Sequence, residues 1–135
     1  MNNKIKFKIY SIDGKSFEED IDAIYLDVPN HGIIGLLKGH TPYCAMLHIS
    51  TFYTINNGVK TYFAISGGTI NFKNNEAILL AQTYEKEDEL DKARIEKVRD
   101  EAINLLSKID KNDQVAYDNA SFTLKKAINR LKILK

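Results

Sequence analysis

The chain has 135 residues, of which 44% are hydrophobic and 27% are charged, and its formal net charge is +1. This length allows one domain, or one domain with an appendage, and excludes two large domains. The near-neutral charge gives no general reason to expect a nucleic-acid partner, and no apolar run approaches the roughly 20 residues that cross a bilayer.

The first residues and the cysteine content favour the cytoplasm. The N-terminus alternates charged and apolar residues, whereas a secretory signal has an unbroken apolar stretch followed by small residues. Cys44 is the single cysteine, so it cannot form an internal disulfide, as expected in a reducing compartment. We therefore expect a cytoplasmic protein without a membrane span.

The first 84 residues have the pattern of short strands separated by turns. In the stretch KIKFKIY, Ile5, Phe7 and Ile9 alternate with lysines, which is the period of a half-buried strand. Asn57-Gly58 is the clearest hairpin turn, because both residues tolerate positive φ values. Further candidate strands recur about every 8 to 12 residues, which favours an antiparallel sandwich or barrel. They cover Phe17–Val28, Ile33–Leu37, Tyr43–Ile49, Thr51–Ile55, Val59–Ser66, Thr69–Phe72 and Ala77–Ala81.

Residues 85–135 have the composition of helices. All seven glycines and both prolines precede residue 69, and these last 51 residues carry 23 charged side chains against 14 in the first 84. Apolar residues at alternating spacings of three and four predict one stripe on each of two helices. The stripes are Ile95, Val98, Ala102, Leu105 and Ile109, and then Ala116, Ala120, Leu124, Ala127, Leu131 and Leu134. The polar stretch 108–113 separates them, so the sequence predicts a helical hairpin.

This hairpin is slim and carries charge of opposite sign on its two helices. Both stripes are narrow and rich in alanine, so the helices bury little apolar area and are marginal alone. Residues 85–110 carry nine acidic against six basic side chains, whereas residues 111–135 carry two against six. The predicted second helix also keeps Lys125, Lys126 and Arg130 in its middle turns, in addition to the basic residues that suit its C-terminal end. A weakly held basic helix suits an acidic partner surface.

Three patterns suggest chemistry, and each has a plainer explanation. His40, Cys44 and His48 carry metal-ligand atoms, but on a strand the two histidines lie about 27 Å apart, too far for one ion. Ser66-Gly67-Gly68 precedes a strand and lacks the lysine and helix of a phosphate-binding loop, so a bend between strands is favoured. The carboxylates at 18–22 have no apolar pocket to tune them for acid–base work. The residues alone therefore predict no active site, and they favour a subunit of an assembly.

Three stretches, in order, resemble the epsilon subunit of bacterial F-type ATP synthases: GIIGLLKGHTPY at 32–43, FAISGGTINF at 63–72 and AILLAQTYEKEDELDKAR at 77–94. The resemblance spans nearly the whole chain and implies a β + α fold. Residues 1–84 are then a ten-stranded antiparallel β-sandwich that binds the central stalk, and residues 85–135 are a regulatory antiparallel two-helix hairpin.

The resemblance also implies a function and partners. It indicates a non-catalytic stalk subunit that couples rotation to catalysis, and whose hairpin inhibits ATP hydrolysis. Its partners are the gamma subunit, the c-ring and the alpha and beta subunits, with no nucleic acid and no membrane insertion. It implies a peripheral protein on the cytoplasmic face of the cell membrane that requires no cofactor, although some members bind regulatory ATP.

Matching positions give four sets of site residues. The loop that touches gamma is Gly39, His40 and Thr41. The turn that reaches the c-ring is Asn30, His31, Gly32 and Ile33. The inhibitory contacts with alpha and beta are assigned to Lys125, Lys126, Arg130 and Lys132, and ATP binding to Asp91, Arg94, Lys126 and Arg130. Plainer explanations stay open: a glycine-shaped turn, a solvated basic face, and a helix-surface ion pair between Asp91 and Arg94.

The chain departs from the family pattern at several positions. Lys38 replaces a usual proline, and Ile33 stands where an acidic residue is common. Ile95 and Lys126 replace an alanine and an arginine of the nucleotide-binding pattern, and lysine lacks the forked contact of arginine with phosphate. A divergent complex with a different membrane sector therefore stays open. So do a freestanding sandwich that binds a small ligand and dimerises through its hairpin, and an enzyme built on the His–Cys–His pattern.

Overall fold

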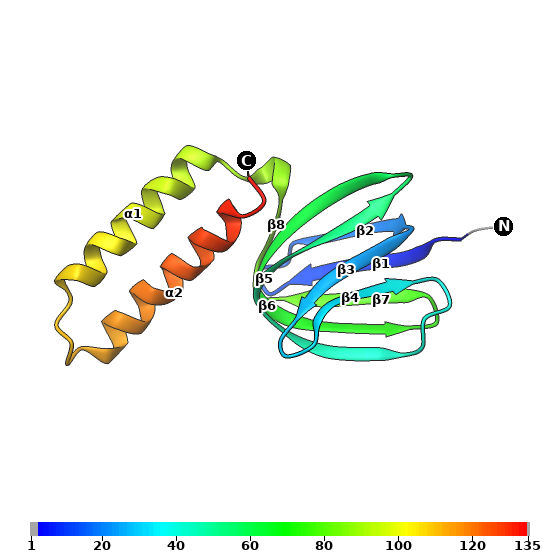
Figure 1. Cartoon of the computed structure of the whole chain (residues 1–135), viewed down its shortest axis with the longest axis horizontal. Coiled ribbons are helices and arrows are strands. Elements are labelled where there is room, and N and C mark those ends of the chain that lie inside the picture. The colour runs from blue at the N-terminus through cyan, green and yellow to red at the C-terminus, as the bar shows by residue number, and fades with distance from the viewer. Residues whose placement is uncertain (1–2, 135) are drawn as a thin grey trace.

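A computed structural model describes residues 3–134, in which strands come first and helices last (Figure 1). The strands are β1 (Ile5–Ser11), β2 (Ser16–Ile21), β3 (Ala23–Val28), β4 (Gly32–Leu37), β5 (Tyr43–Asn56), β6 (Val59–Lys73), β7 (Glu76–Ala81) and β8 (Tyr84–Lys86). A 3-10 turn, η1 (Glu87–Glu89), leads to α1 (Lys92–Lys108) and α2 (Gln114–Leu131).

One continuous sheet bends over to form both layers of a sandwich. Its order is β2-β1-β7-β6-β5-β3-β4, and β8 pairs with β6. β5 and β6 contain 14 and 15 residues, long enough to belong to both layers. Residues 68–73 of β6 pair with β7, whereas residues 63–65 pair with β8, and residues 52–55 of β5 pair with β3. The bend falls near Gly67, which has a φ of 108°.

The predicted β-sandwich with a helical hairpin is confirmed, but three details of the sheet are wrong. The described residues form eight strands and not the ten that the resemblance implies. The two long strands β5 and β6 cross the bend, and together they replace four shorter strands that the alternation predicts. The predicted strand Phe17–Val28 is in turn two strands, divided at Asp22. The sheet is also not fully antiparallel, since β1 and β7 pair in parallel.

The core lies between the two layers and is rich in phenylalanine. Phe52 and Phe63 stack with ring centroids 4.7 Å apart, and Phe7 meets both rings edge-on at 5.9 and 5.7 Å. Ile5, Phe7 and Ile9 are buried, as the alternation in β1 predicts. This core gives the sandwich a rigid support that does not depend on the helices.

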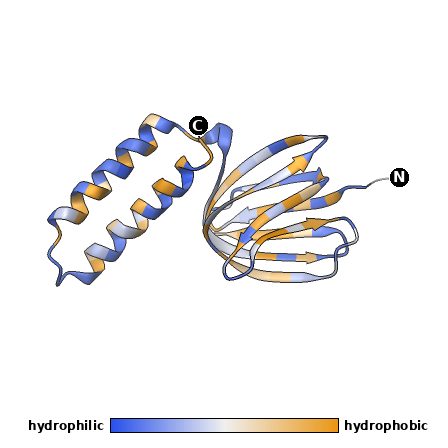
Figure 2. Cartoon of the chain, viewed as in Figure 1, coloured by the Kyte–Doolittle hydropathy of each residue, from blue (hydrophilic) through white to orange (hydrophobic). Residues whose placement is uncertain are grey.

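The two helices form an antiparallel hairpin that projects from one end of the sandwich (Figure 1). Asp91 and Asp113 cap them, accepting hydrogen bonds from the amides of Arg94 and Ala116 at 3.3 and 3.1 Å. Figure 2 shows their apolar residues as separate bands between hydrophilic ones. Leu105 is 52% exposed, contrary to its predicted place in the stripe, whereas Ala102 of the same stripe is buried. No helix within residues 3–134 has the length and apolar character needed to cross a membrane.

Candidate functional site

The hairpin meets the sandwich through the last turns of α2, in a contact that is largely polar. Asn129 is 3% exposed, and its amide nitrogen donates to the carbonyl oxygens of Ser50 and Ile65 at 2.8 and 3.2 Å. Arg130 donates from Nε and Nη2 to Glu85 Oε1 of β8 at 3.1 and 2.7 Å. Among described residues from 92 onward, only Ile95 and Ile133 are large apolar side chains that are buried.

A cleft of about 350 Å³ opens beside this contact, between β8, the start of α1 and the end of α2. Asp91, Arg94 and Arg130 all line it, so the fold brings together three of the four residues predicted to bind ATP. Lys126 lies beside Asn129 and Arg130 in an adjoining gap. Asp91 is already the N-cap of α1, so the two arginines are the groups suited to hold phosphate.

Acidic groups on the same cleft oppose an anion. Glu85 holds Arg130, and Glu89 also lines the wall. Partial burial favours the protonated form of Glu89. However, its hydrogen bonds from the Lys15 side chain and the Lys86 amide, with the charges of both lysines, outweigh burial and place its pKa below the ordinary 4.5. A phosphate group would therefore have to replace Glu85 at Arg130 while Glu89 stays with Lys15.

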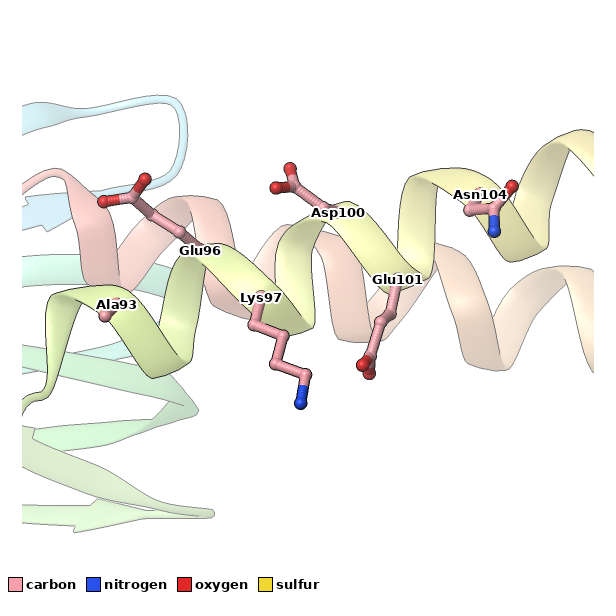
Figure 3. A pocket seen from close by; sticks show the side chains of 6 residues that line it. All are labelled: Ala93, Glu96, Lys97, Asp100, Glu101 and Asn104. Atoms are coloured by element: carbon pink, nitrogen blue, oxygen red, sulfur yellow. The ribbon is translucent and has the colours of Figure 1, made fainter.

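The opposite charges of the two helices do not cancel through direct contacts. Within the described residues, the ion pairs of α1 stay on α1, where Arg99 contacts Glu96 and Asp100 at 3.9 and 3.0 Å. Figure 3 shows side chains of α1, among them Glu96, Asp100 and Glu101, along a shallow, largely acidic surface. On α2, Lys126 lies 4.8 Å from the ring of Phe122, and Lys125 is exposed. Lys132 follows α2 and is exposed.

The loop predicted to touch gamma is exposed and well ordered by local contacts. Gly39 has a φ of 88°, and its amide donates to Asn75 Oδ1 at 2.8 Å. The His40 ring lies edge-on to Tyr43 and Phe72, with centroids 6.2 and 5.9 Å away. Its Nδ1 lies 2.7 Å from the carbonyl oxygen of the neighbouring Thr41, which is exposed.

The turn predicted to reach the c-ring joins β3 to β4 at the other end of β4. Asn30 and Gly32 have φ values of 67° and 78°, and the His31 amide donates to the Val28 carbonyl at 3.0 Å. Ile33 is 65% exposed. β4 runs from this turn toward the His40 loop, and its six residues span roughly 20 Å. The two segments therefore lie at opposite ends of β4.

An apolar row on the outer face of the sandwich was missed by the sequence analysis. Tyr10, Leu80, Thr69 and Met46 are neighbours in register across β1, β7, β6 and β5. Tyr10 is 41%, Leu80 54% and Met46 77% exposed. In the sequence, each of three strands has one apolar residue at a position expected to face solvent, and this was the only sign of the row. The order of the strands in the sheet is needed to show that these residues form one surface.

The metal hypothesis is not supported by the geometry. Cys44 and His48 are exposed on β5, while His40 lies in the preceding loop against aromatic rings. Within residues 3–134, no group of three or more histidine, cysteine or acidic side chains is arranged to hold a metal ion. The carboxylates at 18–22 lie along the edge strand β2 and its end, where Asp22 pairs with Lys4 at 2.7 Å.

Comparison with known proteins identifies the family. The family model described as the ATP synthase delta/epsilon chain β-sandwich domain matches residues 4–87. The ATP synthase epsilon chain of Bacillus cytotoxicus is 32% identical over 125 residues, covering 93% of this chain and 92% of the relative. This chain belongs to the ATP synthase epsilon chain family. The epsilon chain of Pediococcus pentosaceus is 28% identical over 139 residues and covers 99% of this chain and 97% of the relative.

Two solved structures contain chains that share this fold over nearly the whole length. A chain of the Euglena gracilis mitochondrial ATP synthase OSCP/F1/c-ring complex superposes with a TM-score of 0.80 at 19% identity, covering 98% of this chain and 82% of that one. A chain of the Tetrahymena thermophila central stalk and c-ring gives a TM-score of 0.58 at 9% identity, covering 96% of each. At these identities the likeness concerns the fold alone.

Proposed function

We propose that this chain is the non-catalytic central-stalk subunit of an F-type ATP synthase. Residues 1–84 bind the gamma subunit and the c-ring, and residues 85–135 restrain ATP hydrolysis. The observation that carries this proposal is the small, largely polar contact between a slim hairpin and a well-packed sandwich. Such a contact allows two positions of the hairpin whose free energies differ by a few kcal/mol, so partner contacts can select between them.

The sandwich offers two separate surfaces to the rotor. We assign Gly39, His40 and Thr41, with the apolar row of Tyr10, Leu80 and Met46, to the gamma subunit. The exposed row supplies apolar area that gamma would desolvate on binding, and the loop supplies polar groups for hydrogen bonds to gamma. The turn Asn30 to Ile33, at the far end of β4, is assigned to the c-ring. With these contacts, we expect the chain to be a peripheral subunit at the cytoplasmic face of the cell membrane.

The basic side chains of α2 are assigned to the catalytic head. Lys125, Lys126, Arg130 and Lys132 meet acidic surfaces of the alpha and beta subunits when the hairpin extends. Arg130 is the member that must exchange partners, because in the docked hairpin it is held by Glu85. Exchange of one carboxylate for another costs little, which suits a reversible inhibitory contact.

Regulatory ATP fits the cleft beside the hairpin contact. Arg94 and Arg130 would hold its phosphates, Lys126 would add charge from the adjoining gap, and Asp91 would fix the start of α1. Because these groups come from both helices next to β8, bound ATP would favour the docked hairpin. Arg94→Ala should abolish stabilisation of the isolated chain by ATP. A parent chain that ATP does not stabilise contradicts nucleotide binding.

Deletion of residues 86–135 tests the inhibitory function. The complex reconstituted with the truncated chain should hydrolyse ATP faster than the complex with the full chain, at low ATP and low driving force. Equal rates would show that the hairpin is no inhibitor here. One-to-one co-purification with gamma supports the stalk role, whereas a stable homodimer that ignores gamma supports the freestanding module instead.

A further inference from the structure

We propose that Asn129 is a polar latch that fixes where the hairpin docks on the sandwich and keeps the docked state releasable. This inference rests on the proposed regulatory role of the hairpin, and it names the residue that governs release. Asn129 is the one buried polar side chain among the described residues of both helices. Its partners lie 79 and 64 residues away in the sequence, so it joins the two parts of the chain directly.

The geometry of the contact is specific for one docked position. Ser50 and Ile65 face each other as register partners on β5 and β6, and Asn129 donates to the carbonyl oxygens of both. Two acceptors fix the orientation of the amide, because only its NH2 group donates. A slide of one helical turn would bring Lys125 or Ile133 to this place, and neither has a planar amide. The contact therefore sets the register of α2 on the sheet.

The other half of the same amide weakens the latch. Asn129 Oδ1 is buried and accepts no hydrogen bond from any residue in the described range. The gap next to it, lined by Ala64, Ser66 and Thr83, has no space for a water molecule. Docking therefore buries an unsatisfied acceptor, and release returns that acceptor to water.

The surface that release uncovers is also easily hydrated. Under the end of α2 the sandwich presents Ala64, Ser66 and Thr83, which are small or polar, and Ser66 Oγ lies 2.5 Å from Thr83 Oγ1. Release leaves these hydroxyls paired with each other and exposes little apolar area from the sheet. Docking thus gains specificity from Asn129 without the large apolar burial that would make it permanent.

Hydrogen exchange on the full isolated chain tests the latch. Asn129→Ala should speed amide exchange in α2 by about tenfold or more, the effect of losing hydrogen bonds to buried acceptors, because the released hairpin is marginal alone. Asn129→Asp keeps the shape of the side chain, but its carboxylate has no donor at neutral pH. This variant should speed amide exchange in α2 at least as much as Asn129→Ala. Asn119→Ala is the matched control, since Asn119 is exposed on the same helix. Exchange in β1, β5 and β6 should stay unchanged and so report an intact sandwich.

Equal exchange in α2 for Asn129→Ala, Asn129→Asp and Asn119→Ala overturns the latch. In the reconstituted complex, Asn129→Ala should strengthen inhibition of hydrolysis, whereas Asn119→Ala should not. If the full-length and truncated chains give equal hydrolysis, the proposed inhibitory function fails. The exchange experiment on the isolated chain still decides whether Asn129 holds the hairpin.

Discussion

Two adjacent glycines at the bend of β6 serve different physical needs. Gly67 has a φ of 108°, a backbone conformation that other residues rarely adopt, yet a Cβ there would have room, with its nearest heavy atom 3.7 Å away. Gly68 does not have a positive φ, but a Cβ there would lie 2.2 Å from the carbonyl oxygen of Leu80. The Ser66-Gly67-Gly68 motif is thus explained by the bend, without a phosphate ligand.

Gly68→Ala should destabilise the sandwich more than Gly67→Ala. The close approach of β7 leaves no place for the added methyl group, so we expect a loss of about 3 kcal/mol in the free energy of unfolding. Gly67→Ala should lower the free energy of unfolding by about 1 to 2 kcal/mol, the cost of a positive φ for a residue with a Cβ. Urea unfolding of both variants measures the difference. The reverse order would contradict the packing seen at Leu80.

Tyr84 is a second buried residue with an unsatisfied polar atom. It is 2% exposed, and its hydroxyl finds no hydrogen-bond partner in the described part of the chain. Burial, with smaller contributions from the charges of Glu89 and Asp13, raises the pKa of this hydroxyl. The aromatic ring belongs to the core, while the oxygen contributes a desolvation cost.

Tyr84→Phe should therefore stabilise the chain. Removal of the unpaired hydroxyl relieves its desolvation cost, and we expect a gain of about 1 kcal/mol in the free energy of unfolding. Tyr10→Phe is the control, because Tyr10 is 41% exposed and its hydroxyl is open to water. A lower midpoint for Tyr84→Phe than for the parent in urea unfolding would argue that the hydroxyl has a partner.

Secondary elements that are bounded by clear turns could be predicted from the sequence. Period-two alternation indicated β1, and the two apolar stripes indicated α1 and α2 with their caps. The bend was predicted as strand ends, at Ser50 in β5 and at Gly67-Gly68 in β6, although β5 and β6 stay paired on both sides of it. β8 was not predicted, because three residues are too few for a periodic signal.

The junction between sandwich and hairpin should loosen in acid. Lys15 contacts Glu89 at 2.5 Å and donates to the Tyr84 carbonyl at 3.0 Å, so it ties η1 and β8 to the β1–β2 turn. The pKa of Glu89 is lowered on folding, so its stabilising effect is complete above its unfolded value near 4.5 and is lost as pH falls below that value.

Glu89→Gln should remove this part of the acid dependence. The variant should be less stable than the parent at about pH 7, and the difference should shrink as the pH falls below 4.5, where the parent carboxylate takes up its proton. Stability against pH for both proteins is the measurement. Glu87→Gln is the control, because Glu87 is exposed on the same turn. A difference that stays constant down to about pH 3 would exclude the proposed linkage.

At the scale of the whole molecule, the resemblance to the family identified single candidate residues along the sequence. Only the fold shows which of these residues lie close together in space. Asp91, Arg94 and Arg130 come from two segments and line one cleft, and their binding of ATP stays a prediction. Asn129 gave no signal, because one asparagine on a helix does not alter an apolar stripe. The outer row was hidden for a similar reason, since each strand contributes a single residue.

That outer row leads to a prediction about assembly. Met46→Glu with Leu80→Glu places two carboxylates in the surface assigned to gamma, where desolvated charge costs several kcal/mol, so affinity for gamma should fall about 100-fold or more. Both side chains point to solvent in the isolated chain, so thermal stability should change little.

Val59→Glu is the control, because Val59 is 65% exposed at the start of β6, away from the row. Titration of gamma with each variant gives the dissociation constants. Unchanged affinity of the double variant would exclude the row from the gamma interface and leave the His40 loop as the contact to test next.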